Sequence, residues 1–247
     1  MKTSLELKGP DETLDTFYQG RILVLQKKKG YRFSVDSPLL AAFIQTKPGE
    51  ELLELGTGNG IISLLLSLKP FRQITALEIQ DHLADLARRN VRLNNLEGRI
   101  LIVQADLRAF SPGRKFDVIF SNPPYIKWRG GQLSRSEEKS IAKHELKCDI
   151  SDIMGKTREL LKEDGRAYFI YPAKRENDFK SAMDISLLRL KTSRHVLPRE
   201  NGLPNFFLAE CRFSSRDVDV RPPFILYNRD GTYTEEARKI FAGGSIV

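Results

Sequence analysis

The sequence has little of what disulfide frameworks, zinc sites and membrane spans require. Two cysteines, Cys148 and Cys211, occur in 247 residues, and neither belongs to a C-x-x-C pair. The three histidines, His82, His144 and His195, are scattered, so the sequence predicts no metal site. No apolar run is long enough to cross a bilayer, and the N-terminus has no apolar segment of an export signal. Together these absences favour a cytoplasmic protein with reduced thiols.

The charge balance is moderately basic. Lysine and arginine number 40 against 32 aspartate and glutamate residues, which gives a formal net charge of +8. Such a bias favours a polyanionic partner without requiring one. Apolar residues make up 40% of the chain, enough for a sizeable core. Nothing in the composition indicates an oligomeric state.

From residue 51 the chain alternates between strand and helix patterns. The expected strands are Glu51–Leu55, Gln73–Glu78, Arg99–Gln104, Phe116–Phe120 and Arg166–Tyr171, and the expected helices are Ile61–Lys69, Asp81–Asn94, Ser151–Lys162 and Arg175–Ile185. This alternation predicts an α/β fold with a mostly parallel sheet. Two last strands, at about 192–197 and 206–213, are expected to close the sheet in antiparallel fashion. Ligands of such folds gather at the carboxyl ends of the strands.

The segment before this alternation is expected to be smaller and simpler. Residues 1–20 are mixed and polar and predict a loosely ordered lead-in. The apolar segments Arg21–Leu25 and Tyr31–Val35 flank a basic stretch, which predicts a β-hairpin with a basic tip. An Asp-Ser-Pro sequence at 36–38 is expected to cap and start a helix that runs to about Gln45.

A glycine-rich turn follows the first of the parallel strands. In Glu54–Gly60 the glycines allow the backbone to turn tightly and to approach a ligand. The dinucleotide fingerprint needs its third glycine three residues after the second, but Gly60 follows Gly58 by two, which disfavours a nicotinamide cofactor. Glu78 ends the next strand and can accept both hydroxyls of a ribose. Asp106, just past the third strand, can accept from the amino group of an adenine, or serve the loop itself.

The sequence Ser-Asn-Pro-Pro-Tyr at 121–125 follows the fourth strand. The prolines remove two amide donors and fix the backbone, so carbonyl oxygens are held outward beside the Asn122 side chain. Two such acceptors and the ring of Tyr125 form a rigid ledge that can present a planar NH₂ group. The simpler interpretation is a proline-rich turn that only ends the strand. The motif indicates a substrate-binding ledge specifically only together with the cofactor site upstream.

These motifs carry a resemblance to a known class of enzyme. Glu54–Gly60, Glu78, Asp106 and the Asn-Pro-Pro-Tyr stretch, in this order and spacing, resemble the motifs of class I S-adenosylmethionine-dependent amino methyltransferases. The Asn-Pro-Pro-Tyr version is typical of enzymes that methylate adenine N6 or a glutamine amide nitrogen. The flanking stretches, namely Gln26 with Gly30–Asp36, Ala142–Glu145 and Tyr233–Glu236, resemble the bacterial tRNA adenine-N6 methyltransferases that act on the adenine beside the anticodon of a valine tRNA.

The resemblance implies a Rossmann-like methyltransferase fold with a seven-stranded, mostly parallel sheet, S-adenosyl-L-methionine as cofactor and tRNA as partner. Residues 49–220 would form the methyltransferase domain, with residues 1–48 packed on it. Residues 221–247, including a short helix from Thr234, would be a C-terminal tail of the same domain.

The resemblance and the motifs together define three groups of candidate residues. The catalytic candidates are Asn122, Pro123 and Tyr125. The cofactor-binding candidates are Phe33, Asp36, Glu54, Gly56, Thr57, Gly58, Asn59, Gly60, Glu78, Ile79, Asp106 and Asn122. The RNA-binding candidates are Lys27, Lys28, Lys29, Arg32, Lys127, Trp128, Arg129 and Arg135. The three lysines can instead be a solvated tip, and Trp128 can pack as part of a lid rather than stack on a base.

Two other functions fit parts of the same pattern. Methylation of a glutamine N5 in a release factor would use the same ledge, but the expected helical substrate domain before Glu51 is missing and the basic charge balance speaks against it. A non-catalytic RNA-binding module with a nucleotide pocket is the second alternative, although binding alone does not need the Asn-Pro-Pro-Tyr ledge. Residues 198–204 match no expected pattern, so their part in the substrate pocket is open.

Overall fold

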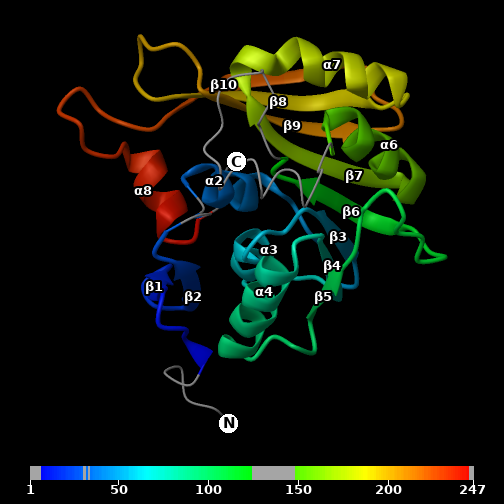
Figure 1. The fold of residues 1–247 in the computed structure, drawn as a ribbon. Coiled ribbons are helices and arrows are strands. Elements are labelled where there is room, and N and C mark those ends of the chain that lie inside the picture. Colours follow the sequence, from blue (N-terminus) through cyan, green and yellow to red (C-terminus); the bar gives the residue numbers. More distant parts are fainter. Residues whose placement is uncertain (1–6, 30–31, 33, 124–147, 245–247) are drawn as a thin grey trace, which may run out of the picture.

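The structure is a computed structural model that describes residues 7–29, 32, 34–123 and 148–244. Within them, an eight-stranded sheet lies at the centre, with helices on both faces (Figure 1). Its strands are β3 (Glu51–Leu55), β4 (Gln73–Glu78), β5 (Ile100–Gln104), β6 (Phe116–Ser121), β7 (Leu161–Pro172), β8 (Arg189–Leu197), β9 (Phe206–Arg212) and β10 (Asp219–Ile225). None of the described helices combines the length and apolar character that a membrane span requires.

The strand order is β10-β8-β9-β7-β6-β3-β4-β5, and only β9 runs antiparallel to its neighbours. This arrangement confirms the expected Rossmann-like fold and the antiparallel direction of the strand at 206–212, whereas β8 runs parallel to the core strands. The sheet has one strand more than the seven expected, because β10 pairs with β8 at the sheet edge. Its two prolines, Pro222 and Pro223, made this segment look like a tail. An edge strand tolerates them, and the register of β10 shifts between Arg221 and Phe224.

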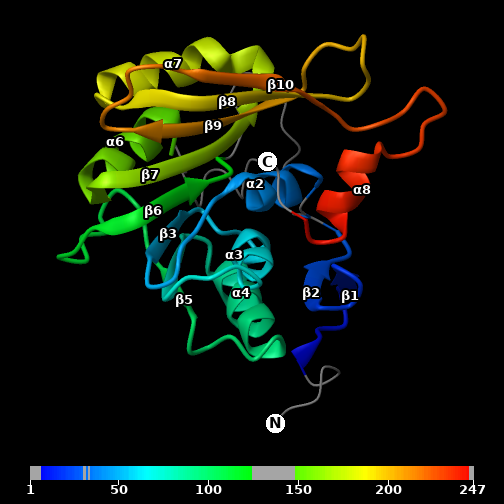
Figure 2. The same cartoon turned by 180° about the vertical axis from the view of Figure 1, so that it is seen from behind.

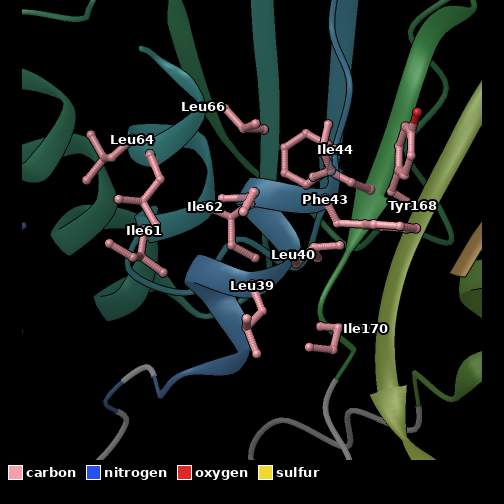
Figure 3. Close-up of a cluster of buried hydrophobic side chains, with 14 of the residues drawn as sticks. Leu39, Leu40, Phe43, Ile44, Ile61, Ile62, Leu64, Leu66, Tyr168 and Ile170 are labelled. Carbon is pink, nitrogen blue, oxygen red and sulfur yellow. The ribbon is translucent and has the colours of Figure 1, made fainter. Parts of the chain in front are cut away.

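Two apolar layers cover the sheet, one on each face. One face carries α2 (Asp36–Phe43), α3 (Ile61–Leu66) and α4 (Asp81–Leu93), and the other carries α6 (Ile150–Leu160) and α7 (Glu176–Ile185) (Figures 1 and 2). Successive strand residues point to opposite faces, so Leu52 belongs to the first layer and Leu53 to the second. Figure 3 shows α2, with Leu40 and Phe43, between the side chains of α3 and Tyr168 and Ile170 of β7.

Helix α2 is buried along its whole length. It begins and ends earlier than expected: Val35 rather than Asp36 or Ser37 occupies the N-cap position, and the helix ends at Phe43 rather than near Gln45. Lys69 holds its carboxyl end, because the ammonium group donates to the carbonyls of Ala41, Ala42 and Ile44 at 2.8, 3.2 and 2.6 Å. Burial lowers the pKa of Lys69 to about 8.

The N-terminal hairpin is built from different segments than expected. Strand β1 (Glu12–Phe17) pairs antiparallel with β2 (Ile22–Lys27). Within the described residues, the prediction that Arg21–Leu25 pairs with Tyr31–Val35 was therefore wrong, and so was the expectation of a loosely ordered lead-in for residues 7–20. Tyr18, Gln19 and Gly20 all have positive φ and make the turn, at a place where the sequence signal was taken for a simple break. The basic stretch thus follows the second strand and is not the tip of the hairpin.

Two further short helices lie in the described part of the chain. Short helix η1 (Ala173–Arg175) leads from β7 into α7. The short helix expected from Thr234 is α8 (Glu235–Phe241), with Thr234 as its N-cap, whose hydroxyl accepts from the amide of Ala237. Figure 1 shows α8 and the β1–β2 hairpin on the side of the molecule where α2 and α4 lie. The helices expected at 61–69, 81–94, 151–162 and 175–185 are all present, with ends that differ by up to three residues.

Candidate active site

The turn after β3 lies between the carboxyl ends of neighbouring strands. The amides of Gly56 and Thr57 donate to the carbonyl of Leu77 in β4 at 3.0 and 2.8 Å. On the other side, the hydroxyl of Ser121 in β6 donates to the carbonyl of Leu55 at 2.6 Å. Three adjacent strand ends are therefore tied to one turn. This brings the glycine-rich stretch, the end of β4 and the residues after β6 to the same edge of the sheet, as the sequence predicted.

The glycines of this turn serve two different needs. Gly56 has a φ of +78°, and a Cβ added there would meet nothing within 4 Å. Space therefore exists beside its backbone. Gly60 has a φ of +87° and precedes α3, and an added Cβ would lie 3.4 Å from the Cβ of Ala87 in α4. The first glycine leaves room for a ligand, and the second allows the turn and α4 to pack closely.

Glu54 is fully buried below the turn. One carboxyl oxygen, Oε2, accepts from the hydroxyls of Thr57 and Ser63 at 2.6 and 2.5 Å. The other oxygen, Oε1, has no hydrogen-bond partner among the described residues. Burial raises the pKa of Glu54 to about 7, although the two hydroxyls favour the ionised form. Ser63 was not among the predicted residues, and nothing in its position on an apolar helix distinguished it.

Glu78 is the second buried carboxylate at this edge, with 5% of its surface exposed. Its Oε2 accepts from the amide of Gly58 at 2.8 Å, and its Oε1 accepts from the amide of Gln80 at 2.9 Å. Burial raises the pKa of Glu78, and backbone amides, including that of Ile79, oppose the shift. A carboxylate has room for about four hydrogen bonds, so the side chain keeps acceptor capacity for hydroxyl groups of a ligand.

Asn59 lies in the same turn and is fully buried. Neither its amide oxygen nor its amide nitrogen has a hydrogen-bond partner in the described part of the chain. Its backbone carbonyl accepts from the side chain of Asn90 in α4 at 2.9 Å. A fully buried side chain with two unused polar atoms is uncommon, because each such atom costs free energy.

Asp106 lies close to Glu78 through the backbone, since the amide of Ala105 donates to the carbonyl of Glu78 at 3.0 Å. Its carboxylate is engaged locally. Oδ1 accepts from the amide of Arg108 at 2.9 Å, and Oδ2 accepts from the Arg108 guanidinium at 2.6 Å. The bond with Arg108 lowers the pKa of Asp106. Asp106 therefore pairs within its own loop, which is one of the two roles that the sequence left open. It lies at the predicted edge of the sheet.

The residues after β6 meet the start of α2. The amide nitrogen of Asn122 donates to Oδ2 of Asp36 at 2.9 Å, across 86 positions of sequence. Asp36 is buried, Asn122 is half-buried, and Pro123 is buried beside them. Sequence reasoning placed both polar residues in the site but did not pair them. No local pattern links a helix start to a strand end so far away.

The basic candidates near the hairpin are only partly available. Lys27 pairs with Asp11 and Glu12 at 3.0 and 3.2 Å, and Arg32 pairs with Asp15 at 3.1 Å. Lys28 donates to the carbonyl of Pro10 at 3.0 Å, and Lys29 is exposed. The candidates Phe33, Tyr125, Lys127, Trp128, Arg129 and Arg135 lie outside the described residues.

Comparisons with known proteins define the class. Residues 31–192 match the family model of the methyltransferase small domain. A predicted O-methyltransferase from Agrobacterium tumefaciens has a TM-score of 0.67 at 17% identity, over 86% of this chain and 98% of that chain. Trm5b from Pyrococcus abyssi has a TM-score of 0.57 at 15% identity, over 82% of this chain and 56% of that chain. Fold and glycine-rich turn are those of a class I S-adenosylmethionine-dependent methyltransferase.

The chain belongs to the methyltransferase small domain family. Among its relatives is a Flavobacteriaceae bacterium protein named tRNA1(Val) (adenine(37)-N6)-methyltransferase, 27% identical over 90% of this chain and 94% of that protein. A protein of the same name from Bacteroides thetaiotaomicron is 28% identical over 88% of this chain and 91% of that protein. The chain is therefore an enzyme of the methyltransferase class, and its cofactor is S-adenosylmethionine.

The residues at the strand ends fit this cofactor. The open space at Gly56 allows a ligand to contact the backbone of the turn. Glu78 offers carboxylate oxygens for the hydroxyls of a ribose. The unused polar atoms of Glu54 and Asn59 lie in the same turn. Acceptors and backbone donors of these kinds suit a ligand that carries hydroxyl, amino and carboxylate groups.

Proposed function

We propose that this chain transfers the methyl group of S-adenosylmethionine to the exocyclic N6 of an adenine in tRNA. The substrate we propose is the adenine 3′ of the anticodon in a valine tRNA, and the compartment is the cytoplasm. The names of the relatives support the substrate. The observation that supports the proposal is the bond of Ser121 to the carbonyl of Leu55, which ties the residue before Asn122 to the residue before Gly56.

The chain must make a weak nucleophile react. Bound S-adenosylmethionine supplies an electrophilic methyl group. The N6 amine of adenine is a poor nucleophile because its lone pair is delocalised into the ring. The amide oxygen of Asn122 and the carbonyl of Pro123 each accept one hydrogen bond from the amine. These bonds draw electron density onto the nitrogen and strengthen as it becomes tetrahedral.

The remaining roles concern binding. We propose that Glu78 accepts from the ribose hydroxyls of the cofactor and that Tyr125 stacks on the target base. The base has to leave its stack, which costs little in an unpaired loop. Lys28 and Lys29 are better placed for phosphate contacts than Lys27, which is paired with two carboxylates.

A single-turnover assay tests the function directly. The enzyme, saturated with cofactor, is mixed with a valine-tRNA anticodon stem-loop, and the product nucleosides are identified by mass spectrometry. We expect N6-methyladenosine at the proposed position. The matched control is the same RNA with purine, which lacks the amino group, in place of the target adenine, and it should stay unmethylated. Methylation of a glutamine peptide from a release factor, with none on RNA, would instead favour the alternative function.

A further inference from the structure

We infer that Asp36 is a positioning residue that fixes which end of the Asn122 amide faces the substrate nitrogen. The inference rests on the proposed function, since it concerns the same ledge. Its basis is the hydrogen bond from Nδ2 of Asn122 to Oδ2 of Asp36, at 2.9 Å. It differs from the expectation that Asp36 binds the cofactor.

The two ends of the Asn122 amide group differ in their chemistry. A primary amide has an accepting oxygen and a donating nitrogen on the same carbon, and a half-turn about the last bond exchanges them. A carboxylate only accepts, so it stabilises the orientation in which the nitrogen faces it. The oxygen then lies on the side of the amide away from Asp36. In the reversed orientation, an NH₂ group would face the NH₂ group of adenine, and neither could accept from the other.

Asp36 can set this orientation because it is itself held in place. Its Oδ1 accepts from the hydroxyl of Ser34 at 2.7 Å and from the amide of Ser37 at 2.9 Å. It belongs to the first turn of α2, where a negative charge interacts favourably with the helix dipole. The other end of α2 is fixed by Lys69, so the carboxylate stands on a buried and doubly anchored helix.

The backbone of the ledge does not depend on Asp36. Residues 118–121 pair with β7, and the hydroxyl of Ser121 binds the carbonyl of Leu55. Pro123 follows with a restricted φ. Loss of the Asp36 carboxylate therefore removes the acceptor that faces Nδ2 of Asn122, while the strand end and the proline stay where they are. This separates positioning of the amide from folding of the ledge.

A double-mutant cycle in single-turnover methylation tests the inference. We expect Asn122→Ala to lower the rate about 10²–10³-fold, by analogy with the loss of one preorganised group that stabilises a transition state. Asp36→Ala should lower it about 10–100-fold, as expected for one lost charge-assisted hydrogen bond. Because Asp36 acts through Asn122, the double variant should be no slower than Asn122→Ala alone. If the rate losses of the two single variants multiply in the double variant, the inference is wrong.

Two further variants separate positioning from folding and from cofactor binding. Asp36→Asn keeps the size of the side chain and one accepting oxygen, so it should recover part of the rate lost in Asp36→Ala. Asp117 is the matched control: like Asp36, it accepts a hydrogen bond from a distant segment, here from the amide of Glu51 at 2.8 Å, but it lies at the start of β6. Asp117→Ala should lower the melting temperature and leave the rate unchanged. A cofactor Kd that rises more than about threefold in Asp36→Ala would assign Asp36 to the cofactor instead.

A measurement without substrate tests the contact between Asp36 and Asn122 separately from the proposed function. In ¹⁵N-labelled, cofactor-free enzyme, the Nδ2 protons of Asn122 should exchange slowly and resonate apart from solvent-exposed amides. Asp36→Ala should remove both properties, and an unchanged signal would contradict the contact. If the wild-type enzyme methylates no adenine, the proposed function fails. The amide spectrum then still decides whether Asp36 holds Asn122.

Discussion

Two neighbouring asparagines, Asn59 in the glycine-rich turn and Asn90 in α4, use their buried amides in opposite ways. The oxygen of Asn90 accepts from the amide of Leu25 at 2.7 Å, and its nitrogen donates to the carbonyls of Leu25 and Asn59 at 3.0 and 2.9 Å. Neither amide atom of Asn59 has a partner among the described residues. A buried polar group that is fully paired stabilises a fold, whereas an unpaired one weakens it. We therefore expect Asn90 to contribute to the stability of the fold and Asn59 to contribute to cofactor binding.

The contact between α4 and the hairpin shows how complete pairing works. Asn94 lies one helical turn after Asn90, and its amide pairs with both the N–H and the C=O of Leu23, at 2.9 and 2.7 Å. Together the two side chains replace a neighbouring strand along the free edge of β2. The ion pair of Arg89 with Glu12, at 2.7 Å, lies at the same contact and holds the pKa of Glu12 at about 2.

The largest effect is expected from breaking the paired region. Asn90→Leu has a similar side-chain size but leaves the N–H and C=O of Leu25 and the C=O of Asn59 without partners. At about 1 kcal/mol or more for each such group, the free energy of unfolding should fall by about 3–4 kcal/mol. Urea unfolding of the cofactor-free protein measures this change. Loss of less than about 1 kcal/mol would show that the α4 contact does not hold the hairpin.

The next largest effect concerns Glu54 and depends on pH. Its pKa is raised from 4.5 to about 7, so between these values the unfolded chain releases a proton that the folded protein keeps. The stabilisation from protonated Glu54 is therefore complete below about pH 4.5. It is lost as the pH rises from about 4.5 to about 7, and none of it remains above that pH. Over this range, the titration of Glu54 changes the free energy of unfolding by on the order of 3 kcal/mol.

Glu54→Gln tests this dependence, because it cannot ionise and still accepts from Thr57 and Ser63. The difference in unfolding free energy between variant and wild type should grow in favour of the variant from pH 5 to pH 8. Other titrating groups cancel in that difference. A difference that stays constant over this range would mean that Glu54 is ionised in the folded protein throughout.

Glu78→Ala is expected to weaken S-adenosylmethionine binding more than tenfold in calorimetry, as for a charge-assisted hydrogen bond of about 1.5–3 kcal/mol. The variant also leaves the amides of Gly58 and Gln80 unpaired, so Glu78→Gln is the control. Glu78→Gln keeps an acceptor for these amides, so its melting temperature should stay near that of the wild type, whereas its affinity for S-adenosylmethionine should fall. Equal affinity in all three proteins would remove Glu78 from the cofactor site.

The sequence predicted the parallel sheet and the strand-end residues because each depends on local signals. Apolar strands, a glycine-rich turn and a polar residue after each strand are readable without knowing what lies opposite. The pairing of β1 with β2 was missed because Tyr18 and Gln19 adopt positive φ without being glycine. The contact of Asp36 with Asn122 and the pairing of Asn90 with Leu25 were missed for another reason. They join segments far apart in sequence, and each residue alone is an ordinary polar residue.

The smallest expected effect, and the sharpest test of the comparison, is Asn59→Leu. The substitution replaces two unpaired buried polar atoms by apolar ones of similar shape, which is neutral or stabilising when nothing else changes. The free energy of unfolding of the cofactor-free protein should stay the same or rise by about 1 kcal/mol, whereas Asn90→Leu lowers it. Affinity for S-adenosylmethionine should move the other way, falling in Asn59→Leu and staying near wild type in Asn90→Leu under conditions where that variant is folded. Equal destabilisation by the two changes would mean that the Asn59 amide is paired in solution. The turn would then bind its cofactor without the help of that side chain.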